Sequence, residues 1–400
     1  MMRVSRADGS RLSRVWFTLD RTLLVAILIL LAIGLVVSLA ASPAVALRKG
    51  LDPFHSVERH VVFAGLALAT VLGFSLLTAR EVRRAALLLY VAGSAAMVYV
   101  LAAGPEINGA QRWLRLGAFS LQPSEFVKPA LIVLAGWLLA ERQRRPDMPA
   151  LIGLVGLSAL FLVLLRLQPD IGQVMLMAAV LAGLGVLAGL SLLWTGGLVT
   201  GGIAALGVAY VTQPYVARRI DAYLSTDFSG TDQASRAIRS FIDGGFFGRG
   251  PGAGTIKTDL PDAHTDYIFA VIAEEYGAVA CIALLALYGF IAFRAVARAL
   301  ASDDLGVRYA LIGLALLFSG QALINMGVNV GLLPATGMTL PFVSAGGSSM
   351  IAISITLGMM LALSCRVPDP RGLSSVPFVV TPELGPTVVG GAGHSGRQGA

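Results

Sequence analysis

Ten apolar stretches alternate with short polar segments along this chain. Each stretch comes close to the roughly 20 apolar residues that a helix needs to cross a bilayer. None shows the ten-residue alternation of a membrane β-barrel. The pattern predicts an all-α polytopic membrane protein with about ten transmembrane helices and a long extracytoplasmic loop, 212–263, between the seventh and the eighth. The expected spans are 22–43, 60–79, 85–103, 124–140, 149–166, 171–189, 191–211, 264–289, 308–332 and 344–364.

Composition supports this class. Of the 400 residues, 56% are hydrophobic and 13% charged, whereas a soluble domain is about a quarter charged. The first span follows a basic leader, is long and precedes many others, so we interpret it as a membrane helix rather than a cleaved signal peptide. We therefore expect a basic cytoplasmic segment (1–20), a transmembrane domain (21–365) and a disordered cytoplasmic tail (366–400). Cys281 and Cys365 fall in apolar spans and are expected to be packed thiols rather than a disulfide.

The distribution of basic residues predicts the orientation. The short segments that share a side with the N-terminus hold more than twice as many Lys and Arg as the short segments opposite, which places both termini in the cytoplasm. The net charge of +7 does not imply nucleic acid, because basic residues beside spans hold topology and attract anionic lipid. In the long loop, the amphipathic segments 215–223 and 234–247 are expected to form short helices along the membrane surface.

Charged groups beside or within apolar spans cost a few kcal/mol each, so dense polar clusters suggest a site. The first cluster runs from Arg112 to Lys128. Arg112, Trp113 and Arg115 also fit a simple interfacial anchor. Glu125 and Lys128 fit that alternative less well, and their i, i+3 spacing predicts a pair on one helix face.

The second cluster, 168–173, predicts a tight turn between two spans, in which Asp170 could cap the following helix. The third cluster predicts a helix that carries Asp266 in its first turn, with Glu274 about 12 Å deeper. A favourable position at a helix N-terminus would explain Asp262 and Asp266. It would not explain Glu274 and Glu275, which need partners or a water-filled cavity.

The fourth cluster, 337–349, is rich in Gly and Pro and opens the last span. Its free N–H groups could bind an anion such as phosphate, although small residues also serve close helix packing. The chain contains neither a GxxxxGK[ST] nucleotide loop nor an HExxH or paired CxxC metal motif.

Together the four clusters resemble the SEDS family (shape, elongation, division and sporulation) of membrane glycosyltransferases, which polymerise peptidoglycan from lipid II. The resemblance covers about residues 20–365, and segments 248–252 and 337–342 favour the division type over the elongation type. One position departs, because Ala345 stands where the family commonly has Tyr. The resemblance rests on Arg112-Trp113 with Gln122-Pro123-Ser124-Glu125, on Gln168-Pro169-Asp170, on His264-Thr265-Asp266 with Glu274-Glu275, and on Pro341-Phe342 with Gly346-Gly347-Ser348-Ser349.

The resemblance implies a ten-span fold with an outward-facing cavity and an inverting glycosyl transfer. Asp266 would be the catalytic base. The residues implied in binding lipid II or its pyrophosphate are Arg112, Trp113, Gln122, Ser124, Glu125, Lys128, Gln168, Asp170, His264, Thr265, Glu274, Ser344, Gly346, Gly347, Ser348 and Ser349. Leaving pyrophosphate calls for cations, so Lys257, Arg218 and Arg219 of the long loop are further candidates. A divalent cation (Mg²⁺ or Mn²⁺) is another way to neutralise it.

By the same resemblance, the expected partners are lipid II, a class B penicillin-binding protein (FtsI), other division proteins and membrane lipids. The expected location is the septal part of the bacterial inner membrane. The alternatives are a lipid II flippase, an elongation-type polymerase and an inactive division scaffold. Polar groups confined to the outer end argue against a flippase, and the presence of Asp266 argues against an inactive scaffold.

Overall fold

The computed structural model describes residues 18–48, 50, 55–106, 110–117, 119–212, 217–218, 220–221, 223, 233–258, 260 and 262–365. The expected N-terminal segment (apart from residues 18–20), the expected disordered tail, Arg219 and most of the predicted helix over 215–223 lie outside these residues.

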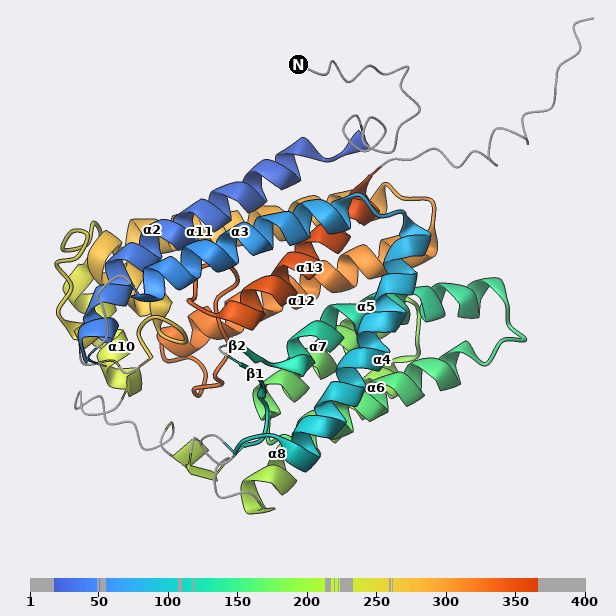
Figure 1. Ribbon diagram of the computed structural model, residues 1–400. Coiled ribbons are helices and arrows are strands. Elements are labelled where there is room, and N and C mark those ends of the chain that lie inside the picture. The colour runs from blue at the N-terminus through green and yellow to red at the C-terminus, as the bar shows by residue number, and fades with distance from the viewer. Residues whose placement is uncertain are drawn as a thin grey trace, which may run out of the picture. The chain divides into compact units, whose positions relative to one another are not determined.

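Helices dominate the described chain (Figure 1). They are α2 (Arg21–Arg48), α3 (His55–Ser75), α4 (Ala79–Ala103), α5 (Pro123–Arg144), α6 (Ala150–Leu167), α7 (Ile171–Leu187), α8 (Leu192–Thr212), α10 (Gln233–Gly244), α11 (Ile268–Leu300), α12 (Leu305–Asn329) and α13 (Gly347–Ser364), with a 3₁₀ turn η1 (Ile256–Thr258). A short antiparallel hairpin pairs β1 (Leu114–Leu116) with β2 (Phe119–Leu121).

The all-α membrane class is confirmed. Within the described residues, 8 helices are long and apolar enough to cross a membrane. The apolar helix α7 is shorter, at 17 residues, and several side chains of α8 lie outside the described set. The count of ten spans and the placement of the long loop stay predictions. Cys281 and Cys365 are free thiols, as expected.

Local capping explains one shifted boundary. The sequence pattern predicts a span from residue 85, whereas α4 begins at Ala79. Thr78 and Glu81 form a capping box: the Thr78 side chain accepts from the Glu81 N–H, and the Glu81 carboxylate accepts from the Thr78 N–H. This reciprocal pair satisfies two N–H groups at the helix start, so the helix extends beyond its apolar stretch.

The core forms around α5, α12 and α13. In the most apolar 18-residue stretch of each helix, 89%, 67% and 83% of the residues are buried, respectively. Helix α5 packs against α4 and α12, and α13 packs against α3. Small residues allow close approach: a Cβ on Gly136 of α5 would lie 2.6 Å from the Ala310 nitrogen of α12. In the outer helices α4, α6 and α11, only 28%, 22% and 28% of the most apolar stretch is buried, as expected for lipid-facing helices.

Helix α11 is broken at Gly277, which has φ 78° and ψ 178°. The loop that follows α10 supplies the missing hydrogen bonds. The N–H groups of Arg249 and Gly250 donate to the carbonyls of Glu274 and Glu275, at 2.9 and 3.0 Å. On the other side of the break, the Ala278 and Val279 N–H groups donate to Gly245 and Phe246. Figure 1 shows α10 lying at this end of α11.

The two glutamates before the break find their partners in the same loop. Glu274 is fully buried and accepts from the N–H groups of Thr255 and Ile256 at 2.6 and 3.0 Å. Glu275 pairs with Lys257 at 2.5 Å. The expectation that these buried carboxylates need partners is confirmed, and residues 244–258 are thereby fixed to α11.

We expect Gly277→Ala to lower the free energy of unfolding by about 3 kcal/mol, since only glycine readily adopts this backbone conformation. A Cβ at Gly277 would also lie 2.3 Å from the Phe246 carbonyl oxygen. Gly289→Ala is the matched control, because nothing lies within 4 Å of a Cβ there, and helical alanine is favoured by about 1 kcal/mol. Thermal unfolding in detergent measures both. Equal midpoints for the two variants would contradict this account of the break.

Candidate functional site

The first and second clusters meet where the hairpin approaches the α6–α7 turn. Arg112 donates to the carbonyls of Gln168 (2.8 Å) and Pro169, and pairs with Asp170 at 3.5 Å. Gln122 donates to the same Asp170 carboxylate at 3.2 Å. Asp170 occupies the N-cap position of α7, yet its side chain makes no capping hydrogen bond. Burial raises the pKa of Asp170, against the lowering effect of the Arg112 charge.

A buried ion pair lies just inside α5. The Lys128 ammonium contacts the two Glu125 oxygens at 3.0 and 2.9 Å and donates to Gln321 at 3.1 Å. Gln173 donates to Glu125 at 2.6 Å. The predicted i, i+3 pairing is therefore confirmed. Its Gln321 contact was not predicted.

The turn 262–267 carries Asp266 and precedes α11, which begins at Ile268. The prediction that Asp266 lies in the first helical turn is therefore wrong. The Thr265 and Tyr267 N–H groups both donate to the Asp262 carbonyl, which closes a separate turn before the helix starts. Asp266 is partly exposed at this point.

Two asparagines of α12 hold the backbone of this turn. Asn325 and Asn329 donate to the Asp266 carbonyl at 3.0 and 2.9 Å, and Asn329 accepts from the Ala270 N–H at 3.0 Å. Asn325 was not predicted. Together with Gln321 these residues recur every four positions in an apolar span, so they share one helix face, and that spacing was the available signal.

The segment before α13 holds the turn from the other side. Ser344 donates to the Thr265 carbonyl at 2.6 Å, and the Ala345 N–H donates to the His264 carbonyl at 2.8 Å. Gly337 is so near that a Cβ there would lie 3.8 Å from an Asp266 carboxylate oxygen. Asp266 therefore lies between α12 and the 337–345 segment.

Other predicted site residues connect these parts. The Gln122 N–H donates to Ser348 at 3.4 Å, and Ser349 hydrogen-bonds Thr339 at 2.6 Å. Gln168 is buried and donates to the Met97 carbonyl at 3.3 Å. Ser124 is fully buried in α5, and Trp113 is partly buried beside the hairpin.

The remaining predicted residues take other positions. Gly346 and Gly347 line a separate small pocket together with His264. Glu274 is enclosed by the loop before η1, as described above. The loop cation Lys257 is buried against Glu275, and Arg218 is exposed.

A cavity of about 640 Å³ opens between α7 and α12. Its wall is mostly aliphatic, and Arg112 and Asp170 are the charged residues that line it. Thr336, the neighbour of Gly337, also lines it. The size and aliphatic wall of the cavity suit a hydrocarbon chain, and the lining residue Thr336 is next in the chain to Gly337, which lies near Asp266. Within the described ranges, no three His, Cys, Asp or Glu side chains are grouped so as to hold a metal ion.

The apolar helices and this buried polar site define a multi-pass membrane protein. The chain belongs to the cell cycle protein family of FtsW, RodA and SpoVE, whose model matches residues 21–367.

Relatives extend over nearly the whole chain. A probable peptidoglycan glycosyltransferase FtsW of Caulobacter vibrioides is 41% identical over 371 residues, 92% of this chain and 95% of the relative. The FtsW of Halorhodospira halophila is 37% identical and covers 91% of this chain and 94% of its own length.

Two solved structures share the fold. One is described as "Structural coordination of polymerization and crosslinking by a peptidoglycan synthase complex" and matches with a TM-score of 0.70 at 32% identity. It covers 87% of this chain and 98% of its own. The rod shape determining protein RodA of Thermus thermophilus matches with a TM-score of 0.64 at 30% identity, over 87% and 97%. The resemblance to the SEDS family is confirmed.

We expect Lys128→Met to lower the free energy of unfolding by about 3 kcal/mol, because it leaves the buried Glu125 carboxylate without its countercharge. The double variant Glu125→Gln/Lys128→Met should lose less, since no buried charge remains. Thermal unfolding of both proteins in the same detergent measures the difference. Equal losses would mean that the pair contributes no electrostatic coupling.

Proposed function

We propose that this chain is a peptidoglycan glycosyltransferase that joins lipid II units into β-1,4 glycan strands during septal cell-wall synthesis. Its site lies at the outer face of the inner membrane, and both termini are cytoplasmic. Family membership supports this proposal, as do the relatives named peptidoglycan glycosyltransferase FtsW. Those relatives favour the division type over an elongation-type polymerase.

One observation carries the proposal: a partly exposed carboxylate, Asp266, is held in a fixed turn beside a large apolar cavity. Its backbone is bonded by Asn325 and Asn329, and the neighbouring Thr265 by Ser344. A general base has to be positioned before it can act, and this turn positions the carboxylate independently of substrate. The cavity supplies the apolar environment that a polyprenyl chain requires.

In the proposed reaction, the 4-hydroxyl oxygen of one sugar attacks the anomeric carbon of a lipid-linked sugar. The Asp266 carboxylate takes the hydroxyl proton. The bond between the anomeric carbon and the pyrophosphate oxygen breaks. The pyrophosphate oxygen takes the bonding electron pair, and the pyrophosphate stays attached to its lipid. A single displacement inverts the anomeric carbon and needs no covalent enzyme intermediate.

The other predicted residues support the site in different ways. Arg112 and Asp170 form the charged part of the cavity wall, and Gln122 donates to Asp170. Glu125, Lys128, Gln173 and Gln321 form the buried network behind it. Because Lys128 and Lys257 are both taken up by glutamates, they are positioning residues in this proposal rather than ligands of the pyrophosphate.

The proposal includes a class B penicillin-binding protein (FtsI) that crosslinks the strands made here, and other division proteins. The similar solved complex, described as coordinating polymerization and crosslinking, supports a partner of this kind.

We expect Asp266→Ala to abolish polymerisation of purified lipid II, with and without the class B partner, while leaving the protein folded and inserted. Asp262→Ala is the matched control, because Asp262 lies exposed in the same turn and should leave activity within about twofold of wild type. A glycan ladder resolved on a gel measures both.

Retained activity in Asp266→Ala would remove Asp266 from the role of base. The absence of a ladder from every protein, the wild type with its partner included, would contradict the polymerase. A lipid translocation assay in vesicles would then test the flippase.

A further inference from the structure

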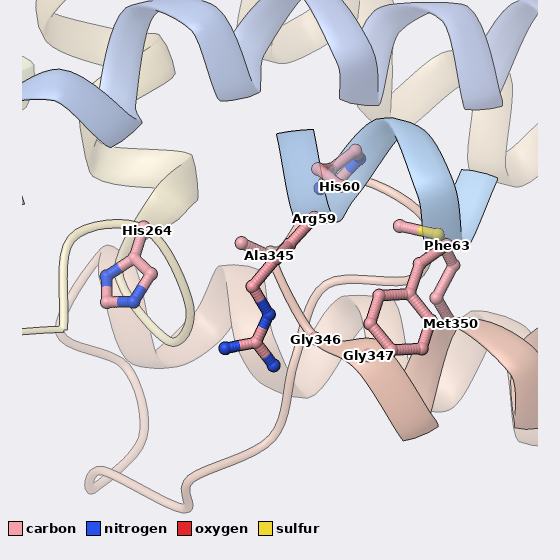
Figure 2. Close-up of a pocket in the computed structure, with 8 residues that line it drawn as sticks. All are labelled: Arg59, His60, Phe63, His264, Ala345, Gly346, Gly347 and Met350. Atoms are coloured by element: carbon pink, nitrogen blue, oxygen red, sulfur yellow. The ribbon is translucent and has the colours of Figure 1, made fainter. Parts of the chain in front are cut away.

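A second, smaller pocket lies against the turn that carries Asp266 (Figure 2). Its volume is about 120 Å³, several times the roughly 30 Å³ of a water molecule in the liquid. In Figure 2 the Arg59 side chain extends from α3 into the space between His264 and the Gly346-Gly347 backbone. The pocket is lined by Arg59, His60, Phe63, His264, Ala345, Gly346, Gly347 and Met350.

The charge of this pocket is not balanced by its own walls. No acidic side chain is among the residues that line it. Arg59 is exposed and, within the described part of the chain, forms no ion pair. By contrast, Arg112, Lys128 and Lys257 are each paired with a carboxylate. An arginine left free beside a pocket suits an anion that comes from outside the chain.

His60 is the second sign of a ligand. Its side chain is only 2% exposed, yet neither ring nitrogen has a hydrogen-bond partner among the described residues. A buried polar group without a partner costs about 1–3 kcal/mol, so it calls for an explanation. His60 is among the residues that line the pocket, and an anion that accepts from its ring N–H would give that nitrogen a partner.

The start of α13 adds backbone donors. Its N-cap, Gly346, provides no side-chain hydrogen bond. The N–H groups of Gly347, Ser348 and Ser349 have no acceptor in the residues that the structure describes. Free N–H groups and the helix dipole both favour negative charge at the start of an 18-residue helix. Glycine at 347 also leaves room for Phe63, because a Cβ placed on residue 347 would lie 2.7 Å from a ring carbon of Phe63.

We propose that this pocket receives the pyrophosphate that leaves in the glycosyl transfer, with Arg59 and His60 as its ligands together with the α13 N-terminus. This inference rests on the proposed function. The pocket lies near the starts of α3 and α13, and His264 in its wall is two residues from Asp266. A base and a leaving-group site that share one turn can act in the same displacement, one on the attacking hydroxyl and the other on the departing pyrophosphate.

The two pockets would then bind different parts of the substrate, the large cavity the polyprenyl chain and the small pocket the pyrophosphate. The large cavity is mostly aliphatic, and its one cation, Arg112, is already paired with Asp170. The small pocket places donors that are unpaired within the described residues, Arg59 and the first N–H groups of α13, beside Phe63, Ala345 and Met350. Negative charge grows on the pyrophosphate as the bond breaks, so donors placed there stabilise the transition state more than the ground state.

We expect Arg59→Gln to lower kcat for glycan polymerisation about 100-fold, with a much smaller change in KM for lipid II. Arg59→Lys should recover part of the rate, because it restores the charge. The matched control is Arg115→Gln, which removes an exposed arginine of β1 and should leave kcat unchanged. The full chain with its class B partner is assayed in phosphatidylcholine nanodiscs. A kcat for Arg59→Gln equal to that of the control would overturn the inference.

Binding separates this inference from the proposed function. Undecaprenyl pyrophosphate is titrated onto Asp266→Ala and onto Asp266→Ala/Arg59→Gln in the same nanodiscs, and we expect about tenfold weaker binding to the double variant. Equal binding would overturn the pocket assignment. So would an Arg59 effect seen only with phosphatidylglycerol present, since the anion would then be a bulk lipid headgroup. Arg59-dependent binding by a wild type that makes no glycan would support the pocket and contradict the polymerase.

His60→Leu provides an independent test. It removes the unpartnered ring nitrogens, so we expect a higher unfolding temperature together with a kcat reduced about tenfold or more. A merely structural histidine predicts no loss of rate. A more stable protein with wild-type kcat would therefore remove His60 from the pocket's function.

Discussion

The break in α11 at Gly277 is the constraint on which the rest of the structure depends. A bilayer offers no water to the N–H and C=O groups that such a break frees, so the chain itself must supply their partners. The loop after α10 does so with main-chain hydrogen bonds on both sides of the break. Its neighbours, Thr255 to Lys257, then bind the two glutamates of the same helix. The loop and the first part of α11 therefore form one unit, and the Asp266 turn connects these two parts along the chain.

The same principle governs the rest of the polar groups. In the core around α5 and α12, each buried charge has a countercharge or a hydrogen-bond partner, as Glu125 and Lys128 illustrate. The polar face of α12 uses Gln321 for this network and two asparagines for the Asp266 turn. Such groups fix geometry because they have few alternative partners in an apolar surrounding. One exception is the pocket at Arg59 and His60, whose polar groups lack partners among the described residues, and we therefore assign it to an anionic group.

These features correspond to the physical requirements of the family's chemistry. A hydrocarbon cavity, a positioned carboxylate and a cluster of unpaired donors lie around one short segment, residues 334–347. A polymerase of lipid-linked sugars needs an apolar place for the lipid, a base for the hydroxyl and stabilisation of the leaving pyrophosphate. The departure at Ala345 falls in the wall of the small pocket, where a smaller side chain leaves more space than tyrosine would.

The sequence by itself determined the membrane class, the places of the apolar helices and the polar clusters. The reason is that a charge in a bilayer is costly, so charged residues are rare in membrane-spanning stretches and their positions can be recognised in the sequence. It also determined the Glu125–Lys128 pair, whose spacing lies within one helix. Tertiary structure decided what depends on contacts between distant segments. Examples are the loop that encloses Glu274, the asparagines that hold Asp266, and the meeting of Arg59 with residues 346–347. No periodicity records such contacts, since each forms only when separate helices pack and their unsatisfied groups find one another.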